Sequence, residues 1–365
     1  MAARWAPCRR KFPARFRVYS GYDMTRLFLI ADDLTGALDS GATFAARGAQ
    51  VRVARTVADF PEALECGADV IAVATGTRDG SREAARECLQ EVRALLAGRE
   101  GLIFKKVDSR LKGHIRDELE VLLDGRTKEL IATPAVPALG RYCESGHVTG
   151  TGIDTPIPVA ERLGRPAVIL DARIRAELDA AVPDNPATKD YVGAAGLAAA
   201  LAHRLWPGTA SDPALPPLPA PALLAIGSRD PITLAQVAAL SGVPLAAAPN
   251  GEVPSILAAP VQVVQMTPGA TRVDPARAGE KFAQGIARAV SEIPVATLFA
   301  CGGESANAIL GALGIGQLDL IGEEQPGVPR AQALHSGKVF EIVTKSGGFG
   351  PPDTVVKLVK SLAER

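Results

Sequence analysis

The sequence of 365 residues lacks three features that would place it in particular classes of protein. It has no net charge, because 40 Lys and Arg residues balance 40 Asp and Glu residues, so no positive field attracts a phosphate backbone. It has no uncharged apolar run near the roughly 18 residues that a membrane-spanning helix needs. Its five cysteines form no C-x-x-C pair. We therefore expect a soluble protein of the reducing cytoplasm, with neither nucleic acid nor a membrane as a partner.

The motifs of several common sites are also missing. There is no G-x-x-x-x-G-K-[ST] and no strand followed by G-x-G-x-x-G, which argues against a P-loop and against the nicotinamide site of an oxidoreductase. His203 and His335 have no clustered partners, so residue spacing indicates no metal site. Cys143 and Cys301 have no second cysteine close in the sequence, and we consider a cysteine nucleophile disfavoured.

The composition is that of a globular chain long enough for two domains, with 47% apolar and 22% charged residues. Residues 1–25 stand apart, because they are rich in arginine, contain a single acid, Asp23, and have no apolar signal core. We expect this segment to be a basic, disordered tail.

Short runs rich in Ile, Val, Leu and Phe alternate with helix-like stretches after residue 25. The expected strands are 26–31, 50–55, 69–75, 101–107 and 129–135, and the expected helices are 35–47, 80–98 and 113–124. This alternation predicts a parallel sheet with helices on both faces, and hence a doubly wound α/β domain over residues 26–206.

Residues 207–222 contain six prolines and no helical periodicity, which predicts an extended connector between domains. Beyond the connector, strand-like runs at 222–228, 261–267, 297–303 and 339–348 end in small or polar residues. We expect a second α/β domain over residues 223–365. The predicted fold class is α/β, with two α/β domains that have largely parallel sheets and a ligand cleft between them.

Charged and polar residues gather where the N-terminal strands end. They are Asp32, Asp33, Thr75, Thr77, Arg78, Lys106, Asp108, Ser109, Arg110, Gly140 and Arg141. Open parallel sheets bind ligands beyond the carboxyl ends of their strands, and arginine forks pair with carboxylates while aspartates accept hydrogen bonds from hydroxyls. These residues can therefore hold a polyhydroxylated anion. The alternative is that Asp33 only caps the following helix and that residues 105–110 form an ordinary solvated loop.

Three strands of the C-terminal half end in glycine turns at 227–228, 301–305 and 345–350. Glycine lets backbone amides approach an anion, and helix N-termini favour negative charge, so these turns are suited to phosphates. Each turn taken singly is also compatible with a plain strand-to-helix connection.

Six strings, taken in order along the chain, carry a resemblance to a known family. They are ADDLTGA (31–37), KKVDSRLKG (105–113), PAVP with GR (134–137 and 140–141), GSR (227–229), GGES (302–305) and KSGGFG (345–350). In their content and order they resemble the four-carbon acid sugar kinase family from residue 26 to the C-terminus.

The resemblance implies a two-domain enzyme that phosphorylates the 4-hydroxyl of a sugar acid such as threonate, erythronate or a 3-oxotetronate, with ATP and Mg²⁺. The substrate-side residues implied are Asp32, Asp33, Lys106, Asp108, Arg110 and Arg141. The positions of Thr77, Arg78 and Gly140 at strand ends make them further candidates for binding the substrate. The nucleotide-side residues implied are Ser228, Gly302, Gly303, Glu304, Ser305, Gly347, Gly348 and Gly350.

A mechanism follows as a hypothesis, because phosphoryl transfer needs charge neutralisation and a group that orients the attacking hydroxyl. Asp33 or Asp108 would orient the 4-hydroxyl, and Lys106 would neutralise the transferred phosphoryl group. Arg110 and Arg141 would clamp the substrate carboxylate. Glu304 would be the protein's possible contribution to the Mg²⁺ ligands, and the domains would close on the two substrates.

Two departures from the family pattern bear on the choice of substrate. The loop after Arg141 is short, and Gly76 stands where many members carry an acid. His147 follows the Gly140-Arg141 motif and is either a substrate ligand or an exposed loop residue. The alternatives left open are a kinase for another short hydroxy or oxo acid and a non-catalytic two-lobed sugar-acid-binding protein. A homodimer is a further expectation.

Overall fold

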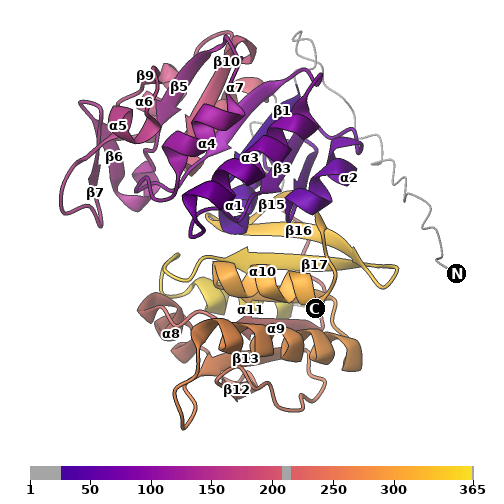
Figure 1. Ribbon diagram of the computed structural model, residues 1–365. Helices are drawn as coiled ribbons and strands as arrows, with labels where there is room; N and C mark the ends of the chain where they lie inside the picture. The colour runs from indigo at the N-terminus through magenta and orange to yellow at the C-terminus, as the bar shows by residue number, and fades with distance from the viewer. Residues whose placement is uncertain (1–25, 208–214, 364–365) are drawn as a thin grey trace, which may run out of the picture.

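The computed structural model describes residues 26–207 and 215–363, which form two stacked α/β lobes (Figure 1). We call residues 26–207 the N-terminal lobe and residues 215–363 the C-terminal lobe. The tail expected at residues 1–25 and residues 208–214 of the expected connector lie outside the described residues. Of the rest of the connector, Leu218 is buried in the C-terminal lobe.

The described residues build a 14-stranded sheet that runs through both lobes. In spatial order its strands are β12 (Leu245–Pro249), β13 (Val261–Thr267), β11 (Ala222–Ile226), β14 (Thr297–Cys301), β17 (Lys338–Lys345), β16 (Val328–His335), β15 (Gln317–Gln325), β2 (Val51–Ala54), β3 (Val70–Ala74), β1 (Leu27–Ala31), β4 (Leu102–Lys106), β10 (Lys189–Gly193), β5 (Glu129–Thr133) and β9 (Val168–Ile169). Each predicted strand is present, and its ends lie within three residues of the expected positions.

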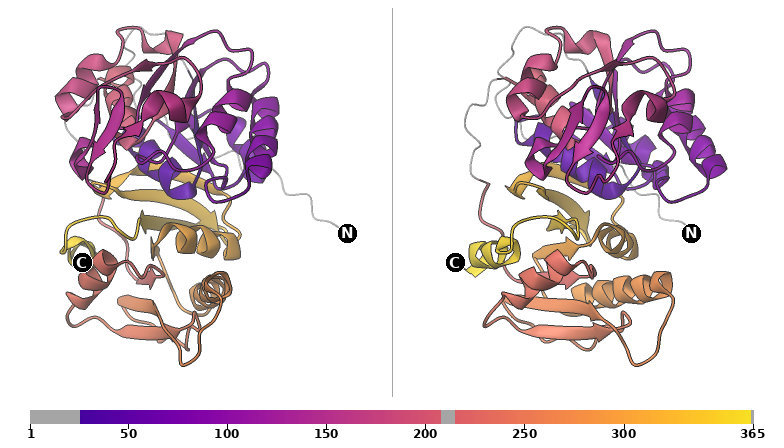
Figure 2. Two further views of the ribbon diagram at one scale, coloured as in Figure 1. Left: turned by 60° about the vertical axis from the view of Figure 1, so that its left-hand side comes forward. Right: turned by 90° about the vertical axis from the view of Figure 1, so that its left-hand side faces the viewer.

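An antiparallel ribbon of three strands, β15, β16 and β17, connects the parallel parts of the sheet. β17 pairs in parallel with β14 of the C-terminal lobe, while β15 pairs antiparallel with β2 of the N-terminal lobe. The Arg52 guanidinium and the Asp319 carboxylate, 2.7 Å apart, reinforce this junction. The expectation of one sheet per domain was therefore incomplete, because the two lobes share hydrogen-bonded strands as well as the connector. The ribbon crosses between the lobes in both views of Figure 2.

Helices cover both faces of the sheet in each lobe. Their bounds are α1 (Leu34–Ala45), α2 (Phe60–Leu64), α3 (Arg82–Leu96), α4 (Ile115–Leu122), α5 (Val159–Leu163), α6 (Arg175–Ala181), α7 (Ala195–Leu205), α8 (Pro231–Ala238), α9 (Pro275–Glu292), α10 (Gly303–Ala312) and α11 (Thr354–Ala363). In the N-terminal lobe α1 packs on α7 and α3 packs on α4, and in the C-terminal lobe α9 packs on α10 and α8 packs on α11. One apolar core continues from the N-terminal lobe to the side of α9 and α10, and a second core lies under α8 and α11.

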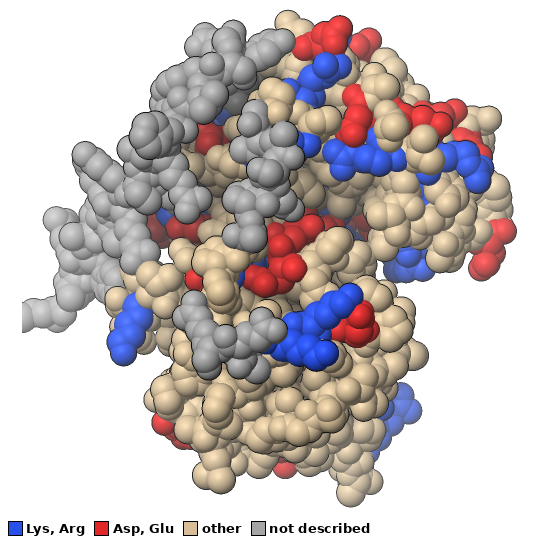
Figure 3. Space-filling view, turned by 180° about the vertical axis from the view of Figure 1, so that it is seen from behind, with Lys and Arg blue, Asp and Glu red and all other residues tan. Residues whose placement is uncertain are grey.

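The segment after Arg141 forms a small antiparallel sheet in place of the short loop expected from the sequence. Its strands are β6 (Arg141–Glu144), β7 (His147–Gly150) and β8 (Ile157–Pro158). Figure 3 shows the molecule from behind the view of Figure 1. On this face, positively and negatively charged side chains are interspersed over the N-terminal lobe and are sparser over the C-terminal lobe. Among the described helices, none combines the length and the apolar character needed to cross a bilayer.

Candidate active site between the lobes

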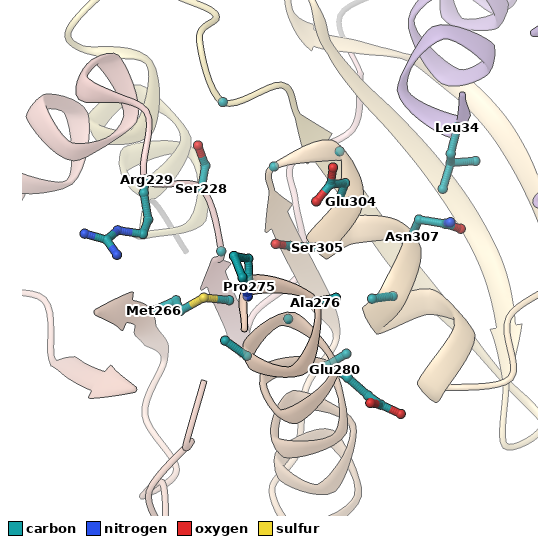
Figure 4. A pocket seen from close by; sticks show the side chains of 18 of the residues that line it. Leu34, Ser228, Arg229, Met266, Pro275, Ala276, Glu280, Glu304, Ser305 and Asn307 are labelled. Atoms are coloured by element: carbon teal, nitrogen blue, oxygen red, sulfur yellow. The ribbon is translucent and has the colours of Figure 1, made fainter. Parts of the chain in front are cut away.

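A cleft of about 1360 Å³ lies between the lobes and is lined by residues of both. The N-terminal lobe contributes Asp32, Asp33, Leu34, Thr35, Gly76, Arg78 and Asp79. The C-terminal lobe contributes the glycine turns, including Gly227, Ser228, Gly302, Gly303, Glu304, Ser305 and Gly347, together with one side of α9. In Figure 4, Ser228, Glu304 and Ser305 lie close together, and Leu34 of the N-terminal lobe lies across from Asn307. The ligand cleft predicted between the domains is therefore present.

The floor of the N-terminal side is an arginine held by two aspartates. Arg78 Nε and Nη2 donate to the two carboxylate oxygens of Asp32 at 2.9 and 2.7 Å. Its Nη1 and Nη2 donate to Asp33 at 2.7 and 2.8 Å. Burial opposes the charged form of Arg78, but its hydrogen bonds and the negative charges around it raise its pKa overall. Arg78 is therefore paired within the protein, and it fixes the positions of both carboxylates.

Asp33 also caps α1, because its Oδ1 accepts a hydrogen bond from the Gly36 amide at 2.8 Å. The capping role considered from the sequence is thus real, and it coexists with the pairing to Arg78. The Lys106 ammonium lies beneath the same turn and donates to the Val107 carbonyl at 3.0 Å. A Cβ at Gly36 would lie 2.6 Å from Asp33 Oδ1 and 3.0 Å from Lys106 Nζ, so the close approach requires glycine there.

Asp32 is almost fully buried beneath the cleft. Burial raises the pKa of Asp32, but the hydrogen bonds from Arg78 and the charges of Lys105 and Lys106 outweigh it. The net pKa therefore lies below the ordinary value of 3.8, and Asp32 stays ionised at neutral pH.

Thr77 belongs to a buried network below Arg78. Its hydroxyl donates to Glu118 and also shares a hydrogen bond of 2.8 Å with Thr75. The Glu118 carboxylate forms a close ion pair with Lys105, at 2.9 Å, whose atoms are not aligned as a hydrogen bond. Thr77 is only 6% exposed, its hydroxyl is engaged inside the lobe, and it does not line the cleft. This geometry does not favour the substrate contact expected from the sequence.

A second cluster of charges lies beside the cleft at the start of β6. The Arg110 amide donates to Asp108 Oδ1 at 2.9 Å, and Arg141 Nη1 donates to Ser109 Oγ at 2.7 Å. Burial lowers the pKa of Arg141, and the neighbouring charge of Arg110 lowers it further. The Nε of Arg110 is buried and has no hydrogen-bond partner within the described residues. Two adjacent guanidinium groups with unused donors are suited to an anion.

Asp108 links this cluster to the cleft electrostatically. Its negative charge favours the protonated forms of both Arg78 and Arg141. Asp108, Arg110 and Arg141 do not themselves line the cleft in this conformation. Of the three, Asp108 is the one whose charge acts on Arg78, which does line the cleft.

Two other residues expected on the substrate side have different surroundings. Gly140 adopts a φ of 64° and its carbonyl accepts from the Thr151 amide, so a tight turn explains this glycine. His147 is exposed at the tip of the β6–β7 hairpin, where its Nδ1 lies 2.8 Å from the Ser145 carbonyl oxygen. It lies three residues along the hairpin from Arg141, which corresponds to about 10 Å. The exposed-loop interpretation of His147 therefore fits the geometry better than a substrate contact.

On the C-terminal side the three glycine turns touch one another. The amides of Gly227 and Ser228 donate to the Cys301 carbonyl, and the Gly302 amide donates to the Lys345 carbonyl at 2.9 Å. A Cβ at Gly347 would lie 2.3 Å from Ser228 Oγ. These contacts bring the predicted nucleotide-side residues into one group, although Gly348 and Gly350 are not among the residues that line the cleft.

The first turns of two helices meet at the junction of the two sides. Gly302 caps α10 with a φ of 105°, and a Cβ on the next residue, Gly303, would lie 2.6 Å from Thr35 Oγ1 of α1. The positive ends of both helix dipoles therefore approach the same point in the cleft. A transferred phosphoryl group would be favoured there.

Sequence reasoning missed one wall of the cleft. Met266 at the end of β13 and Pro275 at the start of α9 border it, followed along α9 by a stripe of small residues. The stripe consists of Ala276, Gly279, Ala283 and Ala287. Their spacing of three or four residues was visible in the sequence as one face of a helix. Nothing in the sequence distinguished a face lining a cleft from one that packs on a sheet.

Carboxylates that suit Mg²⁺ are present on the nucleotide side. Glu304 and Asp230 both line the cleft, and carboxylate oxygens are preferred Mg²⁺ ligands. Within residues 26–207 and 215–363, no cluster of three or more His, Cys, Asp or Glu side chains forms a complete metal cage.

Comparisons with known proteins agree with this arrangement. Residues 27–161 match the family model of a sugar-binding N-terminal domain, and residues 223–355 match that of a nucleotide-binding C-terminal domain. A D-threonate kinase of Bordetella bronchiseptica is 28% identical over 92% of this chain and 97% of its own length. A D-erythronate kinase of Heliobacterium modesticaldum is 33% identical over 34% of this chain and 29% of its own.

A solved structure supports the fold independently. The crystal structure of a Haemophilus influenzae protein of the DUF1537 family superposes with a TM-score of 0.68 at 20% identity, over 91% of this chain and 99% of that one. With both domain models matched in order and a threonate kinase aligned along nearly its whole length, the chain belongs to the four-carbon acid sugar kinase family.

Proposed function

We propose that this protein is an ATP-dependent kinase that phosphorylates the 4-hydroxyl of a four-carbon sugar acid such as threonate, erythronate or a 3-oxotetronate. The observation that carries the proposal is the shared cleft, which joins the Asp32–Asp33–Arg78 cluster of one lobe to three glycine turns of the other. The names of the threonate and erythronate kinases to which the chain is similar support it. A cytoplasmic location and a homodimer remain predictions.

The C-terminal side is suited to ATP along its whole length. The glycine turns and the N-terminus of α10 offer backbone amides to the phosphates. The flat stripe of small residues on α9 and the side chain of Met266 offer an apolar surface for the base. Mg²⁺, held through Glu304 and Asp230, would neutralise phosphate charge when bound.

Gly279→Leu is expected to weaken ADP binding about 30-fold, because the new side chain would occupy the cleft where the base is proposed to lie. A Cβ at Gly279 meets no atom within 4 Å, so the helix itself accommodates the change. Leucine also has a higher helix propensity than glycine, so the melting temperature should not fall. Isothermal titration calorimetry with ADP measures the effect. Arg277→Leu, on the same helix but outside the lining, is the matched control, and equal affinities of the two variants would contradict the base site.

The sugar acid would bind with its carboxylate between Arg110 and Arg141 and its 4-hydroxyl toward the cleft. The negative charge of Asp108 acts both on Arg141 and on Arg78. This shared influence favours Asp108 as the group that accepts the hydroxyl proton. All the hydrogen bonds of Asp33 described here go to Arg78 and Gly36, so we assign it a positioning role. The buried charge of Lys106 would help to neutralise the transferred phosphoryl group.

The decisive experiment is coupled ADP release with Mg-ATP against D- and L-threonate, D- and L-erythronate, the 3-oxotetronates and glycerate. We expect turnover on at least one four-carbon acid. Turnover on glycerate alone would move the assignment to another short hydroxy acid. Binding of the sugar acids without any turnover would support a non-catalytic binding protein and contradict the proposal.

A further inference from the structure

The ammonium group of Lys345 is buried inside the glycine turn that follows β17. The residue is 1% exposed. Its Nζ lies 2.8 Å from the Ser346 carbonyl oxygen, 3.1 Å from that of Gly347 and 3.0 Å from that of Phe349. The Thr233 hydroxyl oxygen of α8 lies 3.2 Å away. Four oxygens thus surround one cation, much as they would surround a bound metal ion.

Polar side chains of α8 complete the enclosure of this turn. The Thr233 hydroxyl donates to the Gly347 carbonyl at 2.6 Å. Gln236 Nε2 donates to the carbonyls of Phe349, Gly350 and Pro351 at 2.8 to 3.1 Å. Thr233 and Gln236 are fully buried. The carbonyl groups of this turn therefore converge on one side, around Lys345 and α8.

The direction of the carbonyls decides the direction of the amides. In a trans peptide the C=O of one residue and the N–H of the next point in opposite directions. The single cis bond among the described residues precedes Pro221, so every peptide unit of this turn is trans. Inward carbonyls of Ser346, Gly347 and Phe349 consequently turn the amides of Gly347, Gly348 and Gly350 outward. Ser346 and Gly347 line the cleft on that side.

The charge of Lys345 is not neutralised locally. Within the described residues no carboxylate oxygen lies within 4.0 Å of its ammonium group. Burial lowers its pKa, whereas the nearby Cys301 and Asp230 act in the opposite direction. A buried cation without a paired anion is costly, so its retention directly behind a phosphate-type turn calls for an anion in front of that turn.

We propose that Lys345 is a positioning residue for the nucleotide: its ammonium fixes the turn so that the two amides that flank the carbonyl-inward residue Gly347, those of Gly347 and Gly348, face the phosphates of ATP, and it adds positive charge behind them. This inference rests on the proposed nucleotide role of the cleft. Lys345 acts through the amides of Gly347 and Gly348 and touches no substrate itself.

Lys345→Ala is expected to weaken ADP binding about 100-fold, as the loss of two oriented charge-assisted contacts would. The KM for the sugar acid, which binds in the other lobe, should change by less than about twofold. Lys338→Ala, at the exposed opposite end of β17, is the matched control and should bind ADP as the wild type does. Calorimetry with ADP and steady-state kinetics give the two numbers.

Chemical rescue distinguishes the effect of the Lys345 charge from the effect of the volume that its side chain fills. In Lys345→Ala, n-propylammonium replaces the lost part of the side chain, and we expect it to restore ADP affinity at least about tenfold. 1-Propanol has a similar shape without the charge and should not restore it. Equal rescue by both compounds, or wild-type affinity of the variant, would overturn the inference.

Two further measurements keep the test conclusive. If Lys345→Ala does not fold, Thr233→Val removes one hydroxyl from the same enclosure and is expected to weaken ADP binding about tenfold. Unchanged affinity of that variant would count against the positioning role. Wild-type protein that binds no ADP would overturn the nucleotide site and this inference together, whereas variants that match a binding wild type overturn the inference alone.

Discussion

Asp108→Asn is expected to lower turnover about 1000-fold while ADP affinity stays within about twofold. Asp108 Oδ1 accepts the Arg110 amide, and within the described residues its other oxygen carries no hydrogen bond, so it can accept the proton of an incoming hydroxyl. The asparagine oxygen can still accept from Arg110, which preserves the loop. The measurement is kcat from coupled ADP release together with the ADP dissociation constant.

Asp33→Asn is the comparison that identifies the acceptor. Asparagine caps helices well, so α1 should persist, while the pairing with Arg78 weakens. We expect turnover to fall about tenfold, as for a lost positioning contact. A larger loss in Asp33→Asn than in Asp108→Asn would make Asp33 the proton acceptor. Full turnover in both variants would exclude both Asp33 and Asp108 as the proton acceptor.

Arg110→Gln is expected to raise the KM for the sugar acid about 100-fold without lowering the melting temperature. In the described residues the Arg110 side chain has a buried Nε without a partner, and its charge opposes that of Arg141. Within the described residues, removing it therefore loses no side-chain hydrogen bond or ion pair, and it relieves repulsion. Binding and stability should move in opposite directions, which is the behaviour of a residue kept for a ligand.

Analogues without a carboxylate give a second readout for the same variant. The wild type should prefer threonate strongly over threitol, the corresponding neutral alcohol, and Arg110→Gln should lose most of that preference. Lys112→Gln removes an exposed charge two residues further along the loop and serves as the control. An unchanged preference in Arg110→Gln would place the carboxylate elsewhere.

The part of the candidate site that could be predicted from the sequence is the part governed by the topology of parallel sheets. Parallel strands end on one edge of a sheet, and this is why Asp32, Asp33 and Arg78 could be expected together although 45 residues separate Arg78 from Asp33. The rule does not predict which charged side chains at this edge form ion pairs with one another. Arg78, expected to bind a substrate, is instead held by two aspartates.

Two of the three strands of the central ribbon, β15 and β16, were not predicted, for a physical reason. Gln317–Gln325 alternates half-buried and buried positions and carries three acids, so it lacks the continuous apolar run of a buried parallel strand. Its position is decided by pairing with Val51–Ala54, more than 260 residues earlier in the chain. Local pattern cannot reveal a partner that distant. The stripe on α9 was missed because small residues along a helix face also fit close packing on a sheet.

The pairing of β2 with β15 has a consequence for synthesis on the ribosome. The first lobe has its own helices and most of its core once residue 207 has emerged, but the edge of β2 then carries unpaired backbone amides and carbonyls. These groups find their partners only after residues 317–325 are made, which takes on the order of ten seconds at an elongation rate of about 10 residues per second. During that interval the nascent chain exposes a strand that can pair with the same edge of another copy.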